Sequence, residues 1–230
     1  MTGAELRTFI INLNGGAEID SVLIEQFVNI AKAIIEGERD WMVLRKTDTS
    51  KSITPSSTWD TAIDTSTITD FSKYYGDYPI RIFDGSEVRD YIRQVPWESR
   101  LENKNVSGTF VYDANGKRIY VNGTVANSGT LYQNYIATTA DIDLESASSI
   151  WTTFPTRFAP MLGFYAIGVY KGAVDYDDIN KLMLPANQGV MLALKNAMEK
   201  WDTDLQQSAI EFNDPSFPYD YPRSGAIQRD

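Results

Sequence analysis

The chain has 230 residues, of which 43% are hydrophobic and 23% charged, so it can bury the core of one large domain or of a domain with an insert. It contains no cysteine, which excludes disulfides and thiolate zinc sites, and no histidine, which excludes the usual catalytic triads and the commonest metal ligand. The 21 basic and 31 acidic residues give a net charge of −10, and the scattered basic residues predict no sequence-independent DNA binding.

The chain contains no apolar run that approaches the roughly twenty residues needed to cross a bilayer. Its first residues, 1–5, lack the basic and apolar regions of a signal peptide. We therefore expect a protein made in the cytosol, with no membrane partner.

The first strongly patterned segment is a predicted helix from about Ser21 to about Arg45, which Asp20 can cap. The polar run 46–52 is expected to end it. Its apolar residues recur in steps of four and three, as an amphipathic helix requires. The stripe consists of Leu23, Phe27, Ile30 and Ile34, widened by Val28, Ala31 and Ile35.

Between Thr54 and Ile142 the apolar period changes to two, which predicts strands. Asp84-Gly85 and Asn115-Gly116 predict two tight hairpin turns, because such turns need positive φ. The segment Ser66–Tyr75 could form a short helix. The predicted strands are Pro79–Phe83, Glu87–Arg93, Thr109–Tyr112, Lys117–Val121 and Thr130–Ile136.

After residue 142 the pattern becomes helical again. Pro160 suits the first turn of a helix that reaches about Val174, Asp175–Leu184 predicts a second short helix, and Pro185 starts the last one. We expect the last helix to pack on the N-terminal one, with Trp41 and Trp201 in the core or at a subunit contact. The residues predicted for helix packing are Trp41, Leu194, Met198, Trp201 and Leu205, and Met191 belongs to the same stripe.

Two clusters of carboxylates could carry chemistry. The first, at 175–178, fails as a calcium loop because Asn180 stands where glycine belongs and Ala186 where a glutamate belongs, so we interpret it as a helix-capping turn. The second, Asp141, Asp143 and Glu145, is interpreted as a solvated strand edge. We predict no catalytic residue, no cofactor and no metal, and hence no enzyme.

The C-terminal tail combines prolines with aromatic residues. Pro215, Pro218 and Pro222 exclude a helix, and the aromatic side chains between them offer rigid apolar anchors. We interpret the tail as an arm that becomes ordered on binding a partner. The predicted partner-binding residues are Phe217, Tyr219, Tyr221, Arg223 and Arg229.

Three passages, 38–46, 110–135 and 154–166 continuing to Trp201, together resemble the head-to-tail adaptor (connector) proteins of tailed bacteriophages, including the tail tubular protein A type. The resemblance implies a virion structural protein that is assembled in the host cytoplasm as a ring, usually twelve-fold, beneath the portal. It also implies that the C-terminal segment clasps the portal protein, that the β region faces a downstream tail or nozzle protein, and that DNA passes through the ring without specific binding.

We therefore expect an α+β fold, in which a helical bundle carries a β-rich central insert and an extended C-terminal arm. The bundle would comprise residues 1–52 and 143–210, the insert 53–142 and the arm 211–230. Two other functions stay open. One is a β-rich carbohydrate-binding or hydrolytic module that uses aromatic and carboxylate side chains. The other is a tail-completion protein of the same phage assembly.

Overall fold

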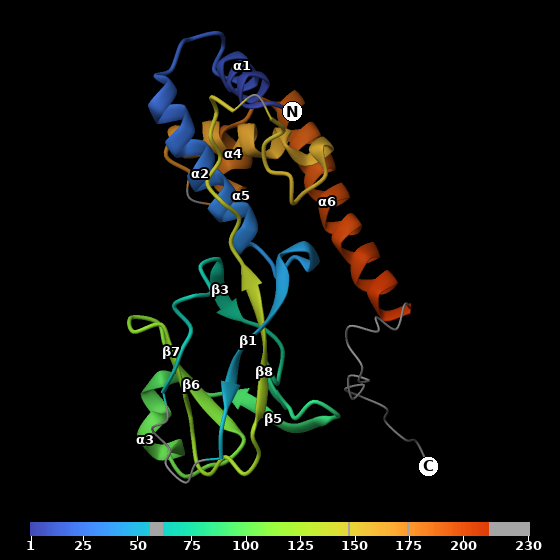
Figure 1. The fold of residues 1–230 in the computed structure, drawn as a ribbon. Coiled ribbons are helices and arrows are strands. Elements are labelled where there is room, and N and C mark those ends of the chain that lie inside the picture. Colours follow the sequence, from blue (N-terminus) through green and yellow to red (C-terminus); the bar gives the residue numbers. More distant parts are fainter. Residues whose placement is uncertain (56–61, 147, 174, 212–230) are drawn as a thin grey trace.

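The computed structural model describes residues 1–55, 62–146, 148–173 and 175–211. These residues form two parts that meet end to end (Figure 1), each with its own cluster of buried apolar side chains. We call them the helical part, residues 1–44 and 138–211, and the sheet part, residues 45–137.

Helix α4 lies at the centre of the helical part. Eight of its residues are buried, as expected for a helix that is apolar on all sides. Its glycines allow close packing: a Cβ on Gly163 would lie 2.5 Å from the Phe9 ring, and one on Gly168 would lie 2.6 Å from Ile179. Helices α2 and α6 lie on opposite sides of α4 (Figure 1). The helices are α1 (Gly3–Leu13), α2 (Ser21–Gly37), α4 (Pro160–Tyr170), α5 (Tyr176–Leu182) and α6 (Pro185–Glu211), with 3-10 turns η1 (Met42–Leu44) and η3 (Thr156–Phe158).

The helices begin at the capping and proline residues that the sequence predicted. The Asp20 carboxylate accepts the backbone N–H of Val22 at 2.9 Å, which confirms the predicted cap of α2. Pro160 and Pro185 open α4 and α6, as predicted. The Asp175 carboxylate accepts the N–H of Asp178, so the acidic turn before α5 is a helix cap.

The sheet part is a curled sheet, or half-barrel, whose strand order is β1-β8-β4-β5-β6-β7-β2, with β3 also paired to β8. All pairs are antiparallel except the parallel pair β5–β6, whose connection carries η2 (Trp97–Ser99) and α3 (Arg100–Asn103). The strands are β1 (Arg45–Ile53), β2 (Ala62–Asp64), β3 (Phe71–Tyr74), β4 (Ile80–Phe83), β5 (Val88–Gln94), β6 (Thr109–Asp113), β7 (Arg118–Val121) and β8 (Gly129–Ala137).

The five predicted strands are confirmed as β4 to β8, each to within one residue at either end. Both predicted hairpins are also confirmed. Gly85 has φ 101° in the β4–β5 turn. In the β6–β7 turn the positive φ falls on Lys117 instead of Gly116, and the Asp113 carboxylate accepts two backbone N–H groups of the turn.

The predicted fold class was wrong. The protein is a mixed α/β structure in which an eight-stranded sheet is too large to be a small insert in a helical bundle. The main reason is β1: the predicted first helix ends at Gly37, and the polar run that was expected to end it pairs with β8 along Arg45–Ile53. The segment Ser66–Tyr75, predicted as a short helix, contains strand β3.

Candidate functional site

Trp41 and Trp201, which were predicted to pack helices, meet around a third ring. Trp41 follows α2 rather than belonging to it, and its indole Nε1 donates a hydrogen bond of 2.8 Å to the Ile35 carbonyl. The Phe154 ring stands edge-on to Trp41, with centroids 5.7 Å apart, and lies 6.1 Å from Trp201. The two tryptophans are therefore linked through the loop that precedes α4.

The other residues predicted for helix packing also lie on the inner side of α6. Met198 is buried, whereas Leu194 and Leu205 are half-buried. The predicted partner helix was wrong, because α4 stands between α2 and α6, and α6 packs mainly on α4, α5 and η1. The predicted binding arm lies outside the described residues; it comprises Phe217, Tyr219, Tyr221, Arg223 and Arg229.

A buried carboxylate ties α6 to the segment that leads into the sheet. Asp202 is fully buried; its carboxylate accepts the backbone N–H of Met42 at 2.5 Å and forms an ion pair with the Arg39 guanidinium at 3.1 Å. The Gln206 amide donates a second hydrogen bond to it at 2.7 Å. A buried charge is tolerated only with such partners, so Asp202 sets how α6 meets the start of β1.

A ladder of polar side chains on α2 holds the segment that leaves the sheet, residues 138–144, which we call the connector. Lys32 donates to the carbonyls of Thr139 and Ala140 and pairs with exposed Asp141 at 3.1 Å. Glu36 accepts the N–H and hydroxyl of Thr139. The full ladder is Glu25, Asn29, Lys32 and Glu36, which bonds the connector at 139, 140, 141, 142 and 144.

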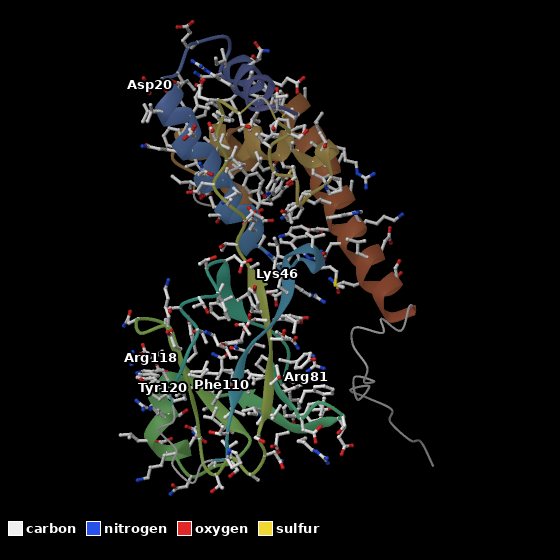
Figure 2. All side chains as sticks on the ribbon, viewed as in Figure 1. Asp20, Lys46, Arg81, Phe110, Arg118 and Tyr120 are labelled. Atoms are coloured by element: carbon white, nitrogen blue, oxygen red, sulfur yellow. The ribbon has the colours of Figure 1, made fainter. Side chains whose placement is uncertain are left out.

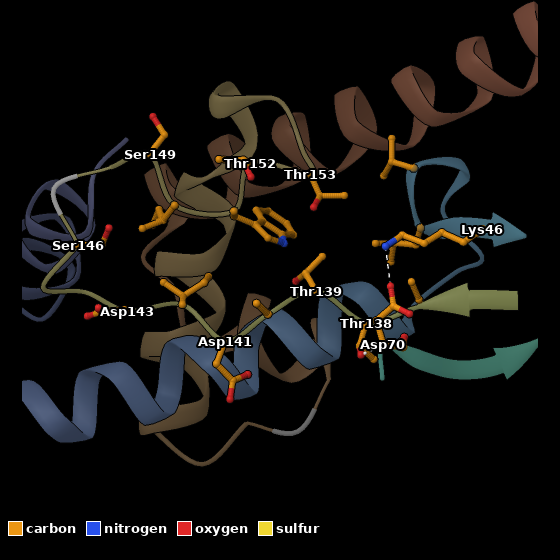
Figure 3. A pocket seen from close by; sticks show the side chains of 17 residues that line it. Lys46, Asp70, Thr138, Thr139, Asp141, Asp143, Ser146, Ser149, Thr152 and Thr153 are labelled. Atoms are coloured by element: carbon orange, nitrogen blue, oxygen red, sulfur yellow. Dashed lines mark hydrogen bonds and ion pairs between the residues drawn. The ribbon is translucent and has the colours of Figure 1, made fainter. Parts of the chain in front are cut away.

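A cavity of about 490 Å³ lies where the two parts meet, between the connector and residues 149–153 (Figure 3). Its walls carry hydroxyl groups on both sides. Trp151 lines it with φ 54°, a strained value for a residue with a side chain, and its indole N–H donates to buried Glu36 at 3.0 Å. The labelled hydroxyl residues are Thr138, Thr139, Ser146, Ser149, Thr152 and Thr153.

An ion pair closes one end of this cavity. The Asp70 carboxylate accepts a hydrogen bond from the Lys46 ammonium at 2.5 Å (Figure 3). It accepts a second from the Tyr135 hydroxyl at 2.9 Å. Burial raises the pKa of Asp70, but these two hydrogen bonds outweigh burial, so its pKa lies below the ordinary value. Burial, together with the hydrogen bond to Asp70, raises the pKa of Tyr135. Through Asp70, Lys46 and Tyr135 therefore link β1 and β8 to the turn before β3.

The described carboxylates do not gather into a site. Among them, no three acidic, histidine or cysteine side chains are grouped so that they could hold a metal ion. The carboxylates predicted to share a strand face follow β8 in the connector and the turn after it, where Asp141 is bonded to Lys32. Every helix in the described part of the chain is too short or too polar to cross a lipid bilayer.

Apolar side chains are exposed on both flanks of the helical part. The residues of α2 that contact the core are Ile24, Val28, Ala31 and Ile35. The predicted stripe precedes each of them by one residue, and it is only partly covered: Leu23, Phe27, Ile30 and Ile34. Leu23 and Ile30 remain 43% and 46% exposed. On the other flank, exposed apolar residues occur on α5, on α6 and between them, and they are Leu182, Leu184, Val190 and Leu192.

No protein-family model matches the chain. A search of curated proteins likewise finds no significant match.

Proposed function

We propose that the protein is a ring-forming head-to-tail adaptor of a phage virion, which joins the portal to the tail and lines the channel through which DNA passes. Its first support is the resemblance to phage adaptor proteins in residues 38–46, 110–135 and 154–166. In this proposal the protein has no catalytic role and needs no cofactor.

The observation that carries the proposal is the difference between the two apolar flanks. The α2 flank exposes Leu23 and Ile30, and the α5–α6 flank exposes Leu184 and Val190. Because α2 and α6 lie on opposite sides of α4, α2 of one copy can meet α6 of the next copy. Head-to-tail contact of this kind is heterologous, and it generates a closed ring when the rotation between neighbours closes.

The charge distribution also suits a channel component. The helical part contains 8 basic and 17 acidic residues, whereas the sheet part contains 11 of each. A surface with excess negative charge repels the phosphate backbone, so DNA can slide past without adhering. We expect the helical part to form the ring wall and the sheet part to face a tail protein.

Native mass spectrometry tests the proposal directly. The isolated protein should be monomeric or weakly associated, and it should form a closed ring when mixed with portal rings from tailed phages. A control mixture with a ring-shaped protein unrelated to phages should leave it monomeric. A chain that stays monomeric with every portal tested would contradict the proposal. Ring formation only on an isolated tail tube would favour the tail-completion alternative.

A further inference from the structure

We infer that neighbouring copies in the ring pack α2 of one copy in parallel against the first half of α6 of the next copy. The inference rests on the proposed function, because it names the contact through which the ring would form. A second copy of this chain would then cover the exposed face of α2.

The uncovered face of α2 has the spacing of a helix-packing seam. Its residues recur at steps of four, three and four, so they lie on one side of the helix, about 100° from the core-facing side. Leu23 and Ile30 are largely exposed, and Phe27 and Ile34 are half-buried at the edge of the core. We call this set the α2 seam: Leu23, Phe27, Ile30 and Ile34.

Helix α6 carries a second seam with the same steps of four, three and four. All four of its residues are exposed, and they too lie about 100° from the side of the helix that contacts the core. We call this set the α6 seam: Ala186, Val190, Ala193 and Ala197.

The two seams are complementary in size. The α2 seam consists of large side chains, and the α6 seam of three alanines and one valine. Helices pack closely when large residues on one meet small residues on the other, because the side chains can then interdigitate. Two α2 seams would instead bring four large residues against four large residues. The shapes therefore favour contact between different helices of two copies.

The direction of the contact follows from the placement of the helices. Both α2 and α6 start at the end remote from the sheet and run toward it, and Asp20 marks that end of α2 (Figure 2). In a ring whose axis follows the long dimension of the chain, rotation preserves these directions. The α2 of one copy is then parallel to the α6 of its neighbour, and Leu23 lies opposite Ala186.

A charge at one end of the seams agrees with the parallel register. Lys200, the next residue on the exposed side of α6 after Ala197, then lies beside the carbonyl end of α2, which favours a cation. The antiparallel register would instead place Lys200 beside Asp20, so the direction of the helices decides the register.

Disulfide cross-linking tests the register without interference, because the natural chain has no cysteine. Two single-cysteine variants are mixed, oxidised while the concentration is raised in steps, and separated on a non-reducing gel. The matched mixtures are Leu23→Cys with Ala186→Cys and Ile30→Cys with Ala193→Cys. The mismatched mixture is Leu23→Cys with Ala197→Cys, and Ala197 lies roughly 16 Å along the helix from Ala186.

The matched mixtures should yield a mixed covalent dimer, because facing Cα atoms of closely packed helices come within the reach of a disulfide. The mismatched mixture should yield none. Cross-linking of the mismatched mixture alone would overturn the parallel register. Oligomers seen by native mass spectrometry without matched cross-links would overturn the seam while leaving the adaptor proposal intact. Absence of both oligomers and cross-links, alone and with portal rings, would contradict the proposed function as well.

A bulky substitution gives an independent test. Ala193→Trp should abolish oligomer formation, because it fills the α6 seam, and the variant should still fold because Ala193 is exposed. The matched control is Asn196→Trp, which places the same ring on another exposed face of α6 and should leave oligomers unchanged. Equal loss of oligomers in both variants, or in neither, would contradict the assignment of the seam.

Discussion

The helical part and the sheet part differ in what they leave on their surfaces. The sheet part balances its charges and has a core of its own, but it also exposes large apolar side chains, which are Tyr78, Tyr91, Trp97, Leu101 and Val106. The helical part carries nearly all of the excess negative charge and exposes apolar side chains on both flanks. Since exposed apolar side chains mark interaction sites, both parts offer candidate contact surfaces, and it is the excess negative charge that distinguishes the helical part.

Polar groups anchor the segments that enter and leave the sheet to the helices, and Ile136 of β8 adds an apolar contact with the core of the helical part. Asp202 ties α6 to the segment before β1, and Lys32 and Glu36 tie α2 to the connector after β8. Hydrogen bonds of this kind fix geometry more than they add stability, because water competes for the same groups when the segments detach. The centre of each core and these polar anchors can therefore be perturbed by different substitutions.

The largest expected effects come from removing one large ring from each core. Trp41→Ala and Phe110→Ala should each lower the free energy of unfolding by about 3–5 kcal/mol, because both side chains are almost fully buried. Denaturation with urea, followed by circular dichroism, measures the loss. If the parts unfold separately, each variant shifts a different transition; if they unfold together, both shift the same one.

Two further tryptophans serve as controls for this comparison. Trp201→Ala should cost clearly less than Trp41→Ala, because Trp201 is only half-buried against Phe154 and Phe158. Trp97→Ala should cost less again, since Trp97 is 41% exposed. A Trp97 variant as unstable as the Trp41 variant would contradict the assignment of the two cores.

A smaller effect is expected at the junction. Lys32→Met keeps most of the buried side-chain volume but removes the hydrogen bonds to Thr139, Ala140 and Asp141, and it should lower the free energy of unfolding by about 1.5–3 kcal/mol. Amide hydrogen exchange should rise in the connector and remain unchanged in strands β4 to β7. The matched control is Lys200→Met on exposed α6, which should change neither quantity.

The sheet was easier to predict from sequence than its connection to the helices. Strands β4 to β8 are rich in β-branched and aromatic residues and are bounded by turn residues, so local patterns were sufficient. Strand β1 was missed because residues 46–52 are all polar and resemble a loop. Its strand structure depends on pairing with β8, more than 70 residues away, which no local pattern reports.

The candidate site could be predicted only in part, for a related reason. Helix α2 has two adjacent apolar stripes with the same spacing, and the position of α4 decides which one is buried. The predicted stripe contains Leu23 and Ile30, which are uncovered, whereas Val28, Ala31 and Ile35, predicted only to widen it, are buried. The polar ladder from Glu25 to Glu36 has helical spacing, but on most helices polar residues with this spacing form a face exposed to solvent. Only the path of the connector shows that this face binds another segment of the chain.

The smallest expected effect is a dependence on pH at the edge of the junction cavity. The pKa of Asp70 is lower in the folded protein than in the unfolded chain, so the unfolded chain takes up a proton first as the pH falls. The contribution of Asp70 to stability is therefore fully present above about pH 4 and is lost as the pH falls through the lower pKa of the folded state. Asp70→Asn should lower the free energy of unfolding by less than about 1 kcal/mol at neutral pH, because the Lys46 pair is partly exposed, and this difference should shrink as the pH falls below the ordinary pKa of an aspartate, about 4. Urea denaturation of both proteins at several pH values measures it. A difference that stays constant, or grows, as the pH falls would show that the Asp70 carboxylate does not stabilise the junction through its charge.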